Sequence, residues 1–253
     1  MKQFQSVDYS NYYLTSNGKK HFLTTNETRF YNYGERYGLS FLSDSAVTLK
    51  KAFYTNSGVF LEAQTTCELI ERNGLRTDFY DFVDLDSIEA RYNKQVGYFN
   101  VIAMSGSTEV SYPIKFVVTP RCSENNEVFF LNELGGIDSF NFNTQIEVKT
   151  SIDDNATFMR NPLSGWTDTL KIEGNAYKTT SKDITLSRES VERECVEWLE
   201  QLGKSKYVYL WSSSLNPKFT MIIVDSCNMT SNNKEDEFNV SISYHLSDDK
   251  LTF

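Results

Sequence analysis

The sequence predicts a mainly β protein made of antiparallel sandwich or barrel domains, and three observations support this fold class. Aromatic residues make up 14% of the 253 residues, with 15 Tyr and 18 Phe against 4 Pro, a composition that suits pleated, half-buried strands. Short apolar runs separated by turn residues repeat between about Gly38 and Phe142, as in antiparallel sandwiches. One segment, at about 188–202, has the periodicity of an amphipathic helix.

We expect three segments along the chain. Residues 1–37 are aromatic but irregular and favour an arm that wraps over a neighbour, with a compact strand pair as the alternative. Residues 38–142 are predicted to form an antiparallel β-sandwich, in which Asn73-Gly74 is a strong hairpin signal. Residues 143–253 are predicted to form a β domain with one helix and a long polar loop at 151–166. The last two segments have either separate cores or a single shared one.

The helix prediction rests on a single apolar stripe. Ser187 is a good N-cap residue, and Glu189 and Glu192 would lie in the positive first turn. Gly203 would end the helix. The stripe consists of residues at positions i, i+4, i+7, i+8 and i+11, namely Val191, Cys195, Trp198, Leu199 and Leu202. We therefore expect this helix to flank the sheet of the C-terminal domain.

The distribution of charge argues against a nucleic-acid-binding module. The net charge is −9, and neither half of the chain has the clustered Lys and Arg on which phosphate binding depends. The acidic run Asp78–Asp86 is interpreted as a solvated strand edge. Cation binding is the alternative, but the run lacks the Gly and closing Glu of a calcium loop.

The sequence predicts no membrane partner. No window approaches the roughly 18 apolar residues that a membrane helix requires, and Met1–Asp8 has no apolar signal core. We therefore expect a protein that is made, or assembled, in a cytoplasm.

No catalytic, cofactor-binding or metal-binding residue is predicted. The four cysteines are far apart and form no Cys-x-x-Cys pair, which argues against structural zinc. A Ser-His-Asp or Cys-His arrangement would need His21 or His245, and neither lies in a recognisable motif. Glu133 and Asp138 are the most tempting carboxylate pair, although a turn-capping role is favoured for Asp138. We therefore expect a protein that is not an enzyme, with a polysaccharide hydrolase as the weakest alternative.

The most informative stretch runs from Phe129 to Phe142, near the middle of the chain. Two apolar runs are joined by Gly135-Gly136, where φ > 0 is sterically free. Phe140 and Phe142 then alternate as on a strand with one buried face. This stretch therefore reads as a strand, a glycine corner and a second strand.

The same stretch, with its Leu-Asn-x-x-Gly-Gly-x-Asp-x-Phe-x-Phe pattern, resembles virion structural proteins of tailed phages that infect Bacteroidetes, including the crAss-like group. The similarity covers mainly residues 115–253. It also includes the strand Lys115–Val118 with Cys122, the predicted helix, Tyr207–Tyr209 and a final strand at Val240–Tyr244. It extends over no catalytic residues.

The resemblance implies a non-enzymatic ring protein of the phage neck or tail, with a tail-tube-like or connector-like fold through which DNA passes. Its partners would be copies of itself in a closed ring and other virion neck or tail proteins, and its location would be the virion, assembled in the host cytoplasm. An acidic ring lumen would weakly repel the passing DNA. The candidate subunit-interface residues are Asn132, Gly135, Gly136, Asp138, Phe140, Trp166, Tyr209 and Trp211.

The main alternative is a carbohydrate-binding or receptor-binding β-sandwich module of a phage or bacterium. Trp166, Tyr209 and Trp211 would then line a groove and stack on sugar rings. Packing in the core or between subunits is the other role open to these rings, since Tyr and Trp are enriched at interfaces.

Overall fold

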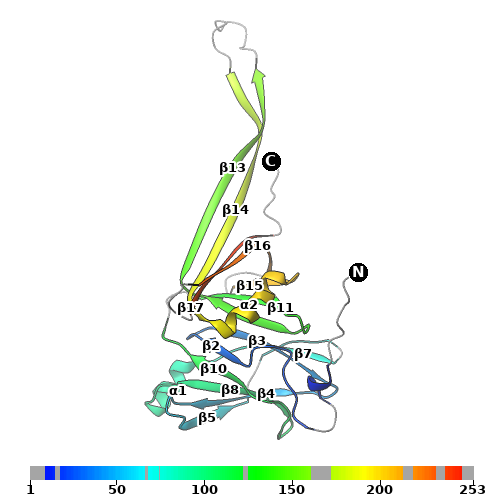
Figure 1. Ribbon diagram of the computed structural model, residues 1–253, viewed down its shortest axis with the longest axis vertical. Helices are drawn as coiled ribbons and strands as arrows, with labels where there is room; N and C mark the ends of the chain where they lie inside the picture. The colour runs from blue at the N-terminus through cyan, green and yellow to red at the C-terminus, as the bar shows by residue number, and fades with distance from the viewer. Residues whose placement is uncertain are drawn as a thin grey trace.

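The structure of the protein, a computed structural model, is mainly β and has three sheets stacked as layers, from which one long hairpin projects (Figure 1). This confirms the predicted mainly β, antiparallel class. The described residues are 9–14, 18–65, 68–73, 75–121, 125–160, 172–212, 219–231 and 237–246.

The first layer is a six-stranded sheet, at the bottom of Figure 1. Its strands pair antiparallel except for the parallel pair β2–β10. The strand order is β2 (Thr28–Tyr31), β10 (Ile114–Val118), β8 (Tyr98–Ser105), β4 (Thr48–Tyr54) and β5 (Phe60–Gln64), with β9 (Thr108–Glu109) also paired to β8.

The second layer is a four-stranded sheet that lies between the other two. Its order is β1 (Tyr13–Leu14), β3 (Arg36–Ser43), β7 (Arg76–Phe82) and β6 (Glu68–Asn73), with β1 parallel to β3. β6 and β7 pair antiparallel up to Asn73 and Arg76, which confirms the predicted hairpin.

The sequence of β3 explains how this sheet is covered on both faces. Its large residues, Tyr37, Leu39 and Phe41, alternate with small ones and pack against the first layer. On the other face, a Cβ on Gly38 would lie 3.0 Å from the ring of Phe129. The Ser40 hydroxyl, also on that face, accepts a 2.7 Å hydrogen bond from a backbone N–H of the third sheet. The small residues therefore let the third sheet approach closely.

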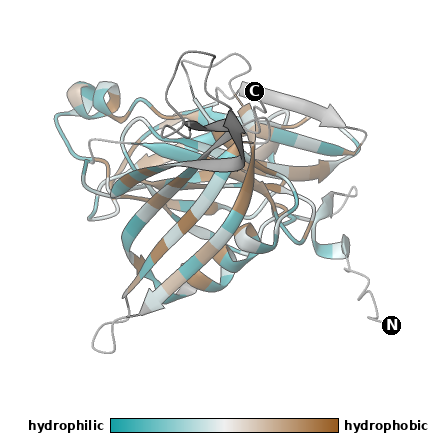
Figure 2. Ribbon diagram, turned by 90° about the horizontal axis from the view of Figure 1, so that it is seen from above, coloured by the Kyte–Doolittle hydropathy of each residue, from teal (hydrophilic) through white to brown (hydrophobic). Residues whose placement is uncertain are grey.

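The third layer is a seven-stranded sheet in which all neighbours are antiparallel. Hydrophobic and hydrophilic residues alternate along strands of the body in Figure 2, as expected for strands with two different faces. The order is β12 (Ile137–Phe142), β11 (Asn126–Leu131), β15 (Val208–Trp211), β16 (Phe219–Ser231), β17 (Glu237–Leu246), β14 (Ile172–Glu192) and β13 (Gln145–Arg160).

The long hairpin is formed by β13 and β14. β17 pairs with β14 only between Ile184 and Glu192, whereas β13 pairs with β14 from Gln145–Ser187 out to Arg160–Ile172. The outer part is therefore two-stranded and projects from the body at the top of Figure 1. We call residues 145–160 and 172–187 the arm.

Two α-helices and a short 3-10 helix, η1 (Tyr9–Asn11), occur in the described part of the chain. α1 (Leu85–Tyr92) begins after Asp84, whose side chain accepts a 3.1 Å hydrogen bond from the backbone N–H of Ser87. α2 (Arg193–Lys204) packs its apolar stripe on the third sheet.

Each half of the chain has its own hydrophobic core. The first core lies between the first and second layers and is rich in rings, with Tyr31, Phe53, Phe79 and Phe99 fully buried. The second core lies between the third sheet and α2.

The N-terminal segment differs from the predicted irregular arm at 1–37. Phe22 and Tyr31 are buried in the first core, and β2 is part of the first sheet. β2 and β3 belong to different sheets, so the alternative of a compact strand pair is also wrong. The cause is a long-range pairing between β2 and β10, whose sequence lies about a third of the chain away.

The expected boundary near residue 142 and the expected loop at 151–166 also differ from the structure. β11 and β12 pair with β15 and so belong to the third sheet, and residues 151–160 continue the strand β13. The rest of that predicted loop, 161–166, lies outside the described residues.

The predicted helix at 188–202 has the right stripe from Cys195 to Leu202 but the wrong start, and Val191 lies in β14. α2 begins at Arg193, because residues up to Glu192 remain in β14 and pair with β17. Ser187 is therefore a strand residue, and Gly203 lies inside the helix.

The acidic run Asp78–Asp86 is not a solvated strand edge. Asp78 and Asp81 are buried, and Asp81 pairs with the buried Lys51 at 2.5 Å. α1, which begins within this run, was missed because only Leu85 and Ile88 face the core.

Candidate functional site

The Gly-Gly corner is held by a buried polar junction centred on Asp138. The Asp138 carboxylate accepts hydrogen bonds from Trp198 Nε1 at 2.7 Å, Asn132 Nδ2 at 2.9 Å and Thr24 Oγ1 at 3.0 Å. It also forms an ion pair with Arg29, whose side chain is buried. The junction therefore joins the N-terminal segment, the hairpin of β11 and β12, and α2.

This junction is closed and has no free reactive group. Asp138 is fully buried, and its oxygens are occupied by four donors. Arg29 also donates to the backbone oxygen of Gly38 at 3.0 Å and lies over the Trp198 ring at 5.2 Å. A buried charge is tolerated when it is paired and fully hydrogen-bonded. Asp138 therefore has a structural role, in which its carboxylate holds the surrounding segments together.

The turn is capped by Asn132, where the sequence had favoured Asp138 for that role. Asn132 Oδ1 accepts hydrogen bonds from the backbone N–H groups of Leu134 at 3.0 Å and Gly136 at 2.9 Å. Glu133 is exposed on the turn, whereas Asp138 is buried. These two carboxylates therefore lie in different environments and form no shared acidic site.

Both glycines of the corner are required by the backbone. Gly135 has φ +77°, a conformation that glycine adopts without steric cost. A Cβ on Gly136 would lie 2.3 Å from the backbone oxygen of Leu23. The Gly-Gly corner therefore lies in close contact with the backbone of the N-terminal segment at Leu23.

Two further carboxylates are buried between the layers. Burial raises the pKa of Glu35 to about 7, although nearby Arg188 lowers it. Burial likewise raises the pKa of Glu127 to about 8; the backbone N–H of Arg36 lowers it, and the charge of Glu35 raises it further. Glu127 Oε1 accepts that N–H at 2.9 Å, while its Oε2 is buried with no hydrogen-bond partner among the described residues.

The predicted interface residues separate into three groups. Asn132, Gly136, Asp138 and Phe140 are buried by contacts within the chain, so they offer no surface to a second subunit and that assignment is corrected. Gly135, Tyr209 and Trp211 are half-buried, and Trp211 lies under the Arg36 guanidinium, 4.5 Å from its ring centroid. Trp166 lies outside the described residues.

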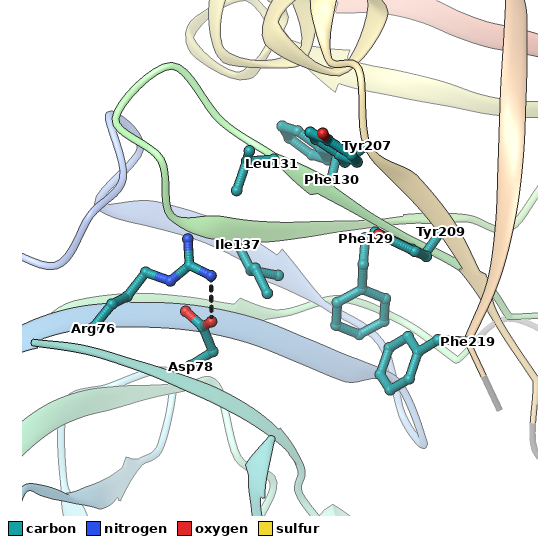
Figure 3. Close-up of a pocket in the computed structure, with 9 residues that line it drawn as sticks. All are labelled: Arg76, Asp78, Phe129, Phe130, Leu131, Ile137, Tyr207, Tyr209 and Phe219. Carbon is teal, nitrogen blue, oxygen red and sulfur yellow. Dashed lines mark ion pairs between the residues drawn. The ribbon is translucent and has the colours of Figure 1, made fainter. Parts of the chain in front are cut away.

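A cavity of about 420 Å³ opens between β7 and the strands β11, β15 and β16 (Figure 3). This volume is within the roughly 300–1,000 Å³ of ligand pockets. Its walls are largely apolar, and the rings and aliphatic side chains that line it include Phe129, Leu131, Ile137, Tyr207, Tyr209 and Phe219.

The other end of the cavity is polar but neutral in charge. Arg76 Nη2 lies 3.0 Å from Asp78 Oδ2, and Arg76 Nη1 donates to the backbone oxygen of Gly135 at 2.8 Å. Figure 3 shows this ion pair facing the cavity from β7. Because the two charges offset each other, the cavity has no net charge with which to select an ionic ligand.

The base of the arm is the second exposed apolar feature. Ile146 and Val148 are 43% and 57% exposed, and their cross-strand partners are Leu186 and Ile184. The only sequence signal for this surface is the alternation of apolar and polar residues at 145–149. Sequence patterns do not reveal the contacts of Arg29 and Thr24 with Asp138, or of Arg76 with Gly135, because these partners are distant along the chain.

The described residues contain no group of three or more His, Cys, Asp or Glu that could hold a metal ion. In the same part of the chain, neither helix is long and apolar enough to span a membrane. No protein-family model matches the chain, and no curated protein matches it in sequence.

Proposed function

We propose that this protein is a non-enzymatic structural subunit that associates with copies of itself into a ring of a tailed-phage neck or tail. The observation that carries the proposal is the arm, which projects from the body and exposes apolar side chains on an edge strand. The resemblance of residues 115–253 to virion proteins supports the same assignment. Other neck or tail proteins would be its neighbours, and DNA would pass through the ring.

The edge position of β13 supports self-association. β13 is the last strand of the third sheet and pairs only with β14 in the described part of the chain. A long edge strand exposes unpaired backbone N–H and C=O groups, which are a template for pairing with another chain. Soluble monomers usually block such edges with short strands or bulges. β13 spans Gln145–Arg160, and its pairing with β14 is regular from Gln145 to Asp154, with register shifts only between Asp154 and Thr157.

The buried polar groups support a structural role over a catalytic one. Asp138 is the most buried carboxylate in the stretch from Phe129 to Phe142. Its oxygens accept hydrogen bonds from four donors of the same chain. A general acid or base needs access to a substrate proton, which this carboxylate does not have.

The second candidate is a carbohydrate-binding or receptor-binding module, and the aromatic cavity is the observation that favours it. Tyr207, Tyr209 and Phe219 present rings there, and Arg76 and Asp78 supply polar groups. In this function the isolated protein would bind glycans as a monomer.

Mass photometry and negative-stain microscopy of the purified protein test the proposal. We expect closed oligomers in the wild type, and monomers in the Ile146→Glu/Val148→Glu double variant, since both side chains are exposed and their replacement spares the cores. Lys149→Glu is the matched control: it directly follows Val148, on the opposite face of the arm, and it changes the net charge by the same amount. A wild type that stays monomeric and binds glycans would contradict the proposal.

A further inference from the structure

The cavity lined by Tyr209 is the end of a longer apolar surface. Tyr209 pairs with Met221 across β15 and β16, and paired residues share a face of a sheet. Met221 and Ile223 on that face are 39% and 43% exposed, and Tyr207 at the cavity wall is 50% exposed. The cavity therefore continues into a strip of exposed apolar side chains, which we call the acceptor strip (Tyr207, Tyr209, Met221 and Ile223).

The size and charge of this surface favour a protein partner. An exposed apolar patch beside a pocket is typical of protein-interaction sites, and a small ligand would leave Ile223 uncovered. Arg76 and Asp78 offset each other at the polar end, so an uncharged apolar occupant fits the cavity better than an ionic one.

The chain itself carries an element with matching chemistry. Ile146 and Val148 on the base of the arm are exposed aliphatic side chains on an edge strand. They cannot reach the cavity of their own molecule. Ile146 pairs with Leu186, which is buried in the second core under α2, whereas Phe129 in the cavity wall packs on Gly38 of the second sheet. Cross-strand partners share a face, so the arm residues and the cavity lie on opposite faces of the third sheet.

We propose that the cavity and the acceptor strip receive Ile146 and Val148 from the arm of a second copy of this chain. This inference rests on the proposed function and names the surface that the arm contacts. Two different patches of each subunit meet, so the contact is head-to-tail. Contacts of this kind close into rings when the rotation between subunits closes, and each subunit in the ring uses its arm once and its cavity once.

A mixing experiment with two variants tests the head-to-tail arrangement. The arm variant is Ile146→Glu/Val148→Glu, which keeps an intact cavity. The cavity variant is Tyr207→Glu, which keeps an intact arm. Tyr112→Glu is the matched control, since Tyr112 is similarly exposed at 47% but does not line the cavity. Thermal unfolding of each variant checks that the fold is retained.

We expect the arm variant alone and the cavity variant alone to be monomeric by mass photometry. In each of these samples, every subunit lacks either a functional arm or a functional cavity, so no contact can form. An equimolar mixture should form a dimer of twice 29.2 kDa and nothing larger, since one intact arm meets one intact cavity. The Tyr112→Glu control should assemble as the wild type does.

The alternative outcomes separate the two proposals. If the cavity variant assembles normally while the arm variant does not, the acceptor lies elsewhere and this inference fails, but the ring proposal stands. If both variants are monomeric and their mixture gives no dimer, the contact is not head-to-tail. A monomeric wild type overturns both proposals, and glycan binding that Tyr207→Glu abolishes would assign the cavity to a sugar.

Discussion

Trp198 Nε1 donates a 2.7 Å hydrogen bond to the carboxylate of Asp138 inside the buried junction between the two cores. The bond connects α2 to the Gly-Gly corner, and both residues are almost fully shielded from solvent. Hydrogen bonds to buried charged groups contribute about 1.5–3 kcal/mol. Stability should therefore respond strongly to changes at this contact.

Replacing Trp198 with Phe should destabilise the protein by about 2 kcal/mol, because the ring still packs on Phe130 and Phe140 but the N–H donor is lost. Urea unfolding measures the difference. Lys204→Ala, which removes an exposed ion pair with Glu200, is the control and should leave stability almost unchanged. Equal effects of the two variants would argue against a special role for the indole N–H.

Asp138 and Arg29 should show strong energetic coupling. Asp138→Leu and Arg29→Met should each cost about 3–5 kcal/mol, since each leaves a buried charge without its partner. The double variant should cost clearly less than the sum of the single variants, because no lone charge remains. A double-mutant cycle from denaturant unfolding gives the coupling energy, and simple additivity would show that the ion pair has no net role.

Stability should fall as the pH rises from about 4.5 to 8. The folded-state pKa of Glu127, about 8, lies above its ordinary value of 4.5, so the unfolded state releases this proton first and ionisation favours unfolding. Glu35, with a pKa of about 7, acts in the same direction. Unfolding midpoints measured across this pH range should show the decline.

Glu127→Gln should flatten this pH dependence and stabilise the protein at pH 8 by on the order of 2 kcal/mol, because the amide stays neutral. The exposed carboxylate Glu133 provides the control, Glu133→Gln, which should leave the slope unchanged. A wild-type slope in the Glu127→Gln variant would place the titrating group elsewhere.

Gly136→Ala should destabilise the protein more than Gly135→Ala. The new Cβ at position 136 would meet backbone, at 2.3 Å from the Leu23 oxygen, whereas at position 135 there is open space and only the positive φ is strained. We expect about 1 kcal/mol at Gly135 and at least twice that at Gly136. Thermal denaturation of the two variants distinguishes these effects, and the reverse order would contradict the close approach.

The sequence predicts the local features of this fold and misses the distant ones. The hairpin at Asn73 and the apolar stripe of α2 depend on neighbouring residues, and both occur in the structure. The role of residues 1–37 and the boundary near 142 depend on strand pairings with distant partners, such as β11 with β15, and these were wrong. Local propensity carries no signal for such pairings.

The candidate site shows the same limit. The Gly-Gly corner was recognised, but Asp138 gives no sign in the sequence that its partners are Thr24, Arg29 and Trp198. The cavity likewise joins Arg76 of β7 to Phe219 of β16. Surfaces assembled from remote segments become visible only once the topology is known.

The Asp138 junction also sets the order in which a newly made chain can mature. Arg29 and Thr24 are synthesised long before Asp138, but Trp198 follows it by 60 residues. Until α2 has left the ribosome, the carboxylate lacks its indole donor and the corner cannot be sealed from water. Release of nearly the whole polypeptide is therefore a precondition for completing the link between the two cores.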